Sequence, residues 1–168
     1  MEKKEADTLD YLRRLCSARE YSRRDVVEKA LRRVEVPAIA ERIADTLQAE
    51  GFQSDLRYAS AYARDKSAIA GWGPAKIRYM LGSKGIGRDI IDLALEEIDS
   101  GKADEKLRKT LLAKYKLLQS DPQVKIKLLK FALSRGYGYE AVHKVVSEIL
   151  HGKNENLQQF DGGTDFRP

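Results

Sequence analysis

Apolar residues recur along this chain at the spacing of amphipathic helices rather than of strands. Ile77, Met80 and Leu81 form one such group, and a second group begins at Ile90 and Ile91. Positions i, i+3, i+4 and i+7 share one face of an α-helix, whereas strands alternate with a period of two. The pattern therefore predicts an all-α fold.

The helical pattern repeats with a period of about 51 residues. Adding 51 carries Val26 to Ile77 and Ile39 to Ile90, and adding 51 again carries Ile77 to Leu128. A fixed period of this length indicates repeated supersecondary units that bury their apolar faces against neighbours. We predict three tandem three-helix repeats in an elongated, curved array, followed by a flexible tail. The predicted boundaries are residues 8–51, 52–101, 102–150 and, for the tail, 151–168.

Local signals predict where several helices begin. Ser22, with Asp25 three residues later, has the spacing of a capping box. Asp121 followed by Pro122 combines an N-cap residue with a favoured first-turn residue. Residues 1–7 are polar, and we expect them to be frayed.

Composition limits the class of protein. The chain has 168 residues, 34% of them charged, and a formal net charge of +5. The single cysteine, Cys16, cannot form an intramolecular disulfide and fits a buried position in a reducing compartment. No apolar run approaches the length of a membrane span, so we expect a soluble, cytoplasmic protein. We also expect it to be a monomer.

The positive charge is concentrated in one third of the chain. Residues 101–150 carry 11 Lys/Arg and five Asp/Glu, whereas the two preceding stretches of 50 residues are each balanced. Such a segment is typical of a face that meets a polyanion or an acidic protein, and equally of a solvated helix surface.

The residues that catalysis needs do not converge in this sequence. His143 and His151 are eight positions apart, no second cysteine is present, and no carboxylates have metal-ligand spacing. The glycine pairs at 71–73 and 85–87 lack the preceding strand of a phosphate-binding loop. We therefore predict no enzymatic activity, no metal and no cofactor.

A binding role has more support. Lysine and arginine on helix faces can neutralise phosphates, and aromatic rings beside them can stack on bases. Trp72 and Tyr137 are candidates for stacking, although packing against a neighbouring helix is the favoured interpretation. Tyr58, Tyr62 and Tyr115 fall on predicted core faces. The candidate binding residues are Arg57, Arg64, Trp72, Lys76, Arg78, Lys84, Arg88, Lys109, Lys116, Lys125, Lys127, Lys130 and Arg135.

Longer motifs in the sequence resemble the RecX family of recombination regulators, over roughly residues 8–150. The residues that carry the resemblance are Gly51-Phe52-x-x-Asp55-x-Arg57-Tyr58-Ala59-x-x-Tyr62-x-Arg64, Gly71-Trp72-Gly73-Pro74-x-x-Ile77-x-x-x-Leu81, Lys84-Gly85-Ile86 and Ser134-Arg135-Gly136-Tyr137. The sequence departs from the family pattern at Tyr58, where phenylalanine is usual, and at Gln53-Ser54, where an apolar residue and an acidic one are usual. Gly87 and Gly138 occupy cap positions that serine or aspartate often fills.

The resemblance implies a non-enzymatic modulator of RecA, the bacterial recombinase. Such a protein would lodge in the groove of the RecA–DNA filament and restrain its growth, ATPase activity and strand exchange. It would also bind single- or double-stranded DNA weakly and without sequence preference. The alternative is a helical-repeat nucleic-acid-binding or adaptor protein that acts independently of RecA.

Overall fold

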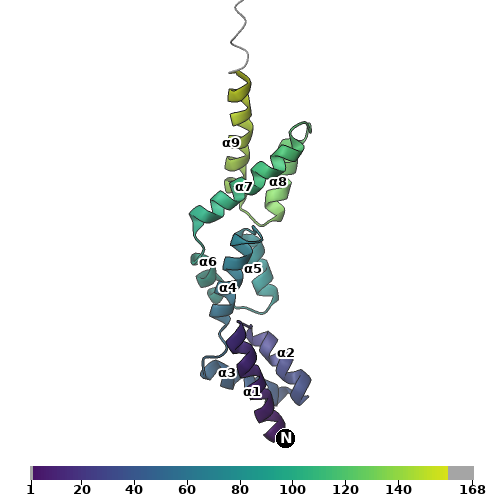
Figure 1. Ribbon diagram of the computed structural model, residues 1–168, viewed down its shortest axis with the longest axis vertical. Helices are drawn as coiled ribbons and strands as arrows, with labels where there is room; N and C mark the ends of the chain where they lie inside the picture. The colour runs from purple at the N-terminus through teal and green to yellow at the C-terminus, as the bar shows by residue number, and fades with distance from the viewer. Residues whose placement is uncertain (1, 159–168) are drawn as a thin grey trace, which may run out of the picture. The chain divides into compact units, whose positions relative to one another are not determined.

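The computed structural model describes residues 2–158, which form nine α-helices and contain no strand (Figure 1). The helices are α1 (Glu2–Ala18), α2 (Arg23–Val34), α3 (Pro37–Ala49), α4 (Asp55–Ala68), α5 (Pro74–Ser83), α6 (Arg88–Glu96), α7 (Ser100–Leu118), α8 (Val124–Ser134) and α9 (Tyr139–Gln158). The prediction of an all-α fold is confirmed. No helix in this part of the chain is both long and apolar enough to cross a membrane.

The helices group into two units by their packing. The first unit comprises Met1–Lys66 and Arg78–Ile98, and the second comprises Ser67–Ile77 and Asp99–Pro168. The residues of the predicted middle repeat are thus divided between the two units. The three repeat boundaries stay a prediction, and the units are described separately below.

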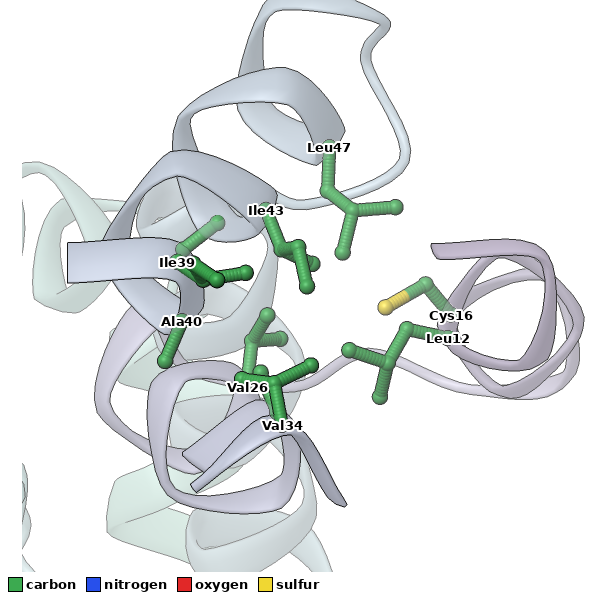
Figure 2. Close-up of a cluster of buried hydrophobic side chains, with 10 residues drawn as sticks. Leu12, Cys16, Val26, Val34, Ile39, Ala40, Ile43 and Leu47 are labelled. Carbon is green, nitrogen blue, oxygen red and sulfur yellow. The ribbon is translucent and has the colours of Figure 1, made fainter. Parts of the chain in front are cut away.

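In the first unit, α1, α2 and α3 enclose an apolar core (Figure 2). Leu12 and Leu47 are fully buried, and Cys16 lies in the same cluster, as predicted. Burying a leucine side chain of this kind contributes about 1.5–3 kcal/mol. The predicted capping box also forms, because Ser22 Oγ accepts from the Asp25 N–H while Asp25 accepts from the Ser22 N–H.

The first helix begins earlier than predicted, at Glu2, so the expectation of a frayed segment over residues 1–7 is wrong. The Glu5 carboxylate pairs with Arg42 of α3 at 2.7 Å, and the Thr8 hydroxyl donates to the Lys4 carbonyl. Thr8 is 1% exposed. These contacts tie the first turns of α1 to the rest of the unit, which the polar sequence alone did not indicate.

In the second unit, α7, α8 and α9 pack around a core that includes Leu107, Leu111, Leu128 and Val146. Tyr137 is 9% exposed and belongs to this core, so its favoured interpretation as a packing residue is confirmed.

One predicted helix start in this unit is wrong. Helix α8 begins at Val124, because Asp121 forms a turn in which its carboxylate accepts from the Gln123 N–H at 2.8 Å. Helix α9 spans Tyr139–Gln158, and the predicted tail from residue 151 stays a prediction. The rest of the predicted tail, residues 159–168, lies outside the described residues.

Candidate functional site

Lysines of the second unit gather on an open groove between α7 and α8. The groove has a volume of about 410 Å³. Its lining residues are Lys106, Lys109, Thr110, Ala113, Lys114, Leu117 and Phe131. None of these is acidic, so the groove combines a positive rim with an apolar floor. The sequence placed Lys109 in the candidate set, and the structure adds its neighbours Lys106 and Lys114.

The aromatic ring in this groove is already engaged by cations. The Lys114 ammonium lies 5.1 Å from the centroid of the Phe131 ring, and the Arg135 guanidinium lies 5.2 Å from it. Cations at this distance are attracted to the ring face. Leu117, 81% exposed, is the most accessible apolar side chain of the groove.

The other lysine candidates on α7 and α8 divide into exposed and paired residues. Lys116, Lys125 and Lys130 are exposed. Lys127 forms an ion pair with Asp121, so part of its charge is neutralised within the chain. Lys109 and Lys116 on α7 and Lys125 and Lys130 on α8 are thus exposed and outside any ion pair of the described residues, and these four residues are together called the lysine face.

Arg135 has a structural role that its place in the candidate set did not indicate. Its guanidinium donates to the Ala70 carbonyl at 2.9 Å, and its own carbonyl accepts from the Gly73 N–H at 2.7 Å. The Ala75 N–H donates to the Gly136 carbonyl at 3.0 Å. This Gly73–Gly136 junction joins the segment before α5 to the turn between α8 and α9, within one unit.

Trp72 and Lys76 lie at the same junction. The Lys76 ammonium is 4.4 Å from the Trp72 ring centroid, and both side chains are half-buried. Part of the Trp72 surface remains accessible, so the structure leaves open the choice between packing and stacking at this residue.

In the first unit, two arginine candidates are held by partners within the chain. Arg57 pairs with Glu20 at 2.9 Å and also donates to the Gly51 carbonyl at 2.8 Å. Arg78 pairs with Asp92 at 2.7 Å. An arginine that is already paired within the chain is less available to an external ligand than an unpaired one.

The remaining candidates of this unit differ in exposure. Arg64 and Arg88 are exposed, and Lys84 is half-buried. Lys84 faces a tyrosine ring, with its ammonium 6.0 Å from the centroid of Tyr62.

Tyr62 belongs to a cleft that sequence reasoning missed. The cleft has a volume of about 430 Å³. Its lining residues are Arg19, Glu20, Tyr21, Asp25, Lys29, Tyr58, Ala61, Tyr62, Asp65 and Lys84. The prediction that Tyr58 and Tyr62 are core residues is wrong, because both are half-buried and line this hollow. The available signal was the spacing of Tyr58, Tyr62 and Asp65 at i, i+4 and i+7, which puts a carboxylate on the same helix face as two rings.

The surroundings of Tyr58 and Tyr62 raise the pKa of both phenols above the ordinary value. Burial raises the pKa of Tyr58, and the negative charge of Asp25 adds to the effect. Burial also raises the pKa of Tyr62, while Lys84 acts against it. Both rings therefore present a polar hydroxyl and an apolar face near neutral pH.

The fold and these surfaces define an all-helical repeat protein with a basic face. Comparisons with known proteins identify the family. Residues 54–95 match the model of the second three-helix domain of RecX. The chain is 32% identical to the regulatory protein RecX of Chromohalobacter salexigens, over 88% of this chain and 95% of that protein. It belongs to the RecX family.

Two further relatives show how far the similarity extends. The chain is 38% identical to the regulatory protein RecX of Clostridium botulinum (strain Eklund 17B / Type B), over 64% of this chain and 51% of the relative. The aligned part thus spans about half the length of that relative. The crystal structure of RecX from Lactobacillus salivarius superposes with a TM-score of 0.78 at 19% identity, over 88% of this chain and 97% of that one. At this identity the structure supports the fold alone.

Proposed function

We propose that this protein is a non-enzymatic regulator of RecA. In this proposal it binds the groove of the RecA–DNA filament and restrains filament growth, ATPase activity and strand exchange. The relatives are named regulatory proteins, and the RecA partner comes from the resemblance of the sequence motifs to the family. The protein would act from the cytoplasm and would bind DNA weakly and without sequence preference.

The observation that carries the proposal is the lysine face with its adjoining groove. Lys109, Lys116, Lys125 and Lys130 are exposed, and no ion pair among the described residues engages them. Unpaired lysines release counterions when they meet a polyanion, which gives salt-dependent affinity. A nucleoprotein filament presents such a polyanion along its length.

The alternative function is a nucleic-acid-binding protein that does not require RecA. The same lysine face favours it, because phosphate contacts are independent of any protein partner. The two functions differ in whether the filament is preferred over bare DNA.

Co-sedimentation with RecA filaments across a salt series tests the proposal. We compare the wild type with K109E/K116E on α7 and K125E/K130E on α8. The control is K3E/R14E on α1, which changes net charge equally and replaces two exposed residues. Each lysine-face variant should reduce the slope of log affinity against log salt by about two. Melting temperatures should stay within a few degrees of wild type.

The outcomes separate the two functions. Preferential binding to the filament, lost in the lysine-face variants and kept in the control, supports a RecA regulator. Equal binding to bare DNA and to the filament, with no change in RecA ATPase activity, supports the alternative. Full filament binding by both lysine-face variants would show that another surface makes the contacts.

A further inference from the structure

The tyrosine-lined cleft is built entirely from one unit and takes no part in the lysine face. It is formed by the segment between α1 and α2, by α2 and α4, and by Lys84 after α5. A volume of about 430 Å³ lies in the range of sites for small ligands. The segment matched to the RecX domain model, residues 54–95, supplies half of the lining, from Tyr58 to Lys84.

The charges that line the cleft are unequally available. Glu20 pairs with Arg57, and Asp25 is held in the capping box of α2. Asp65 is exposed and has no hydrogen bond or ion pair within the described part of the chain. The cleft therefore offers one uncommitted carboxylate as a hydrogen-bond acceptor.

The three cations of the cleft are free of carboxylate partners. Among residues 2–158, no ion pair involves Arg19, Lys29 or Lys84. Arg19 and Lys29 instead lie over the Tyr21 ring, at 4.5 and 5.3 Å from its centroid. Three available positive charges beside one available carboxylate suit a ligand that is mostly anionic and also carries an N–H donor.

The aromatic wall, formed by Tyr58 and Tyr62, adds apolar ring surface, and the Lys66 ammonium lies 5.4 Å from the centroid of Tyr62. The Tyr58 and Tyr62 rings have centroids 6.0 Å apart and planes tilted by 32°. Aromatic side chains of this kind stack on bases in proteins that bind single strands, and stacking needs a base that is not already paired in a duplex.

The geometry points to a binding site for a nucleotide of single-stranded DNA in this cleft, with a preference for bases that carry an exocyclic amino group. The tyrosine wall would stack on the base, Arg19, Lys29 and Lys84 would hold the phosphates, and Asp65 would accept from the amino group. Carboxylates accept in this way from the amino group of cytosine, whereas thymine offers only a carbonyl at the same position. This inference rests on the DNA binding of the proposed function and adds to it a second site, which needs no RecA and which, unlike the phosphate contacts of the lysine face, distinguishes between bases.

A neighbouring hollow gives a strand room to continue. It has a volume of about 310 Å³ and shares Asp25 and Lys84 with the cleft. Arg24 also lines it and donates to the Ser83 carbonyl at 3.0 Å. A strand held in the cleft thus has a continuous route along α2.

Fluorescence anisotropy with the full chain and no RecA tests the inference. The probes are labelled twelve-nucleotide oligodeoxycytidine, oligodeoxythymidine and a duplex of the same length. We expect oligodeoxycytidine to bind about fivefold more tightly than oligodeoxythymidine, which corresponds to one base contact. Unlabelled dCMP should compete only at far higher concentration than the oligonucleotide, because it lacks the neighbouring phosphates.

Two pairs of variants separate stacking from base recognition. Tyr62→Leu should weaken the affinity for both single strands at least fivefold, because it keeps apolar volume but removes the ring. Its control, Tyr79→Leu, replaces a tyrosine that lies outside the cleft and is 75% exposed. Asp65→Ala should remove the preference for cytosine. Its control, Glu96→Ala, also loses one exposed carboxylate of the same unit but should keep the preference for cytosine.

Three results would overturn the inference. Equal affinity for the two single strands would refute the proposed contact between Asp65 and the base. An equal loss of single-strand affinity in Tyr62→Leu and Tyr79→Leu would refute the proposed stacking. Competition by dCMP at the concentration of the oligonucleotide would assign the cleft to free nucleotides. None of these measurements contains RecA, so failure here leaves the proposed function to its own test.

Discussion

Replacing Gly136 by alanine should destabilise the second unit strongly. Gly136 has φ of +88°, in the left-handed region that L residues rarely adopt. A Cβ placed on it would lie 2.4 Å from both the Cβ and the backbone nitrogen of Lys76. Neither atom can rotate away, because the Cβ and the nitrogen of Lys76 are both fixed by the backbone in the first turn of α5.

The expected cost has three parts. The left-handed conformation costs a non-glycine residue about 1–2 kcal/mol. Relieving the clash requires the backbones to separate, which strains or breaks the hydrogen bonds from Gly73 to Arg135 and from Ala75 to Gly136. Each of these contributes about 0.5–1.5 kcal/mol. The sum is a loss of about 2–5 kcal/mol in the free energy of unfolding.

Urea denaturation followed by circular dichroism measures this loss against two controls. Gly51 has φ of +78°, and a Cβ placed on it would meet nothing within 4 Å, so Gly51→Ala isolates the conformational cost. Gly82 lies in α5 with open space around it, so Gly82→Ala should stabilise by up to about 1 kcal/mol. If Gly136→Ala lowers the free energy of unfolding no more than Gly51→Ala does, the close approach of Lys76 makes no contribution to the cost and the reasoning is refuted.

Two further predictions concern the first unit. Ser22→Ala removes the capping box with Asp25 and should lower the free energy of unfolding by about 1 kcal/mol, whereas the exposed helical Ser17→Ala should leave it nearly unchanged; thermal melts of both variants decide. The hydrogen bond from Arg42 lowers the pKa of Glu5 below its ordinary value. A carboxylate with a lowered folded-state pKa stabilises above its unfolded pKa, and this stabilisation is lost as pH falls through the folded value. Glu5→Gln should therefore show a smaller fall in melting temperature between pH 6 and pH 3 than wild type. An equal fall in the two proteins would contradict this.

Much of the fold could be predicted because its signals are local. The capping box of Ser22 and Asp25 needs only four residues of sequence, and Gly51 terminates α3 with the positive φ that glycine tolerates. The helical period fixes which faces are buried, and it correctly placed Leu12 and Leu128 in the cores.

One error had a local cause and the other a long-range cause. Asp121 and Pro122 resemble a helix start, yet Asp121 is engaged by Lys127 and by the Gln123 N–H, and α8 begins at Val124. The polar first turns of α1 are ordered by Arg42, which lies 37 positions from Glu5. No short window of sequence contains such a pair.

The candidate site was less predictable for the same reason. Sequence showed which residues are basic, but it could not show that Arg57 is committed to Glu20 or that Lys125 is exposed without a partner. The tyrosine-lined cleft was missed because Tyr58 and Tyr62 face Tyr21 and Lys84 only after three separate segments fold together.

Arginine and lysine differ in their contacts in this protein. Among residues 2–158, arginine forms nine ion pairs, whereas Lys4 and Lys127 form one each. The guanidinium fork matches a carboxylate in two places, as Arg42 does with Glu5, so arginine suits fixed contacts between helices. Lysine is a flexible point charge, so in the proposed function the lysine face would meet a polyanion without a required register. Arginine substitutions should therefore change stability more than binding, and substitutions in the lysine face should do the reverse.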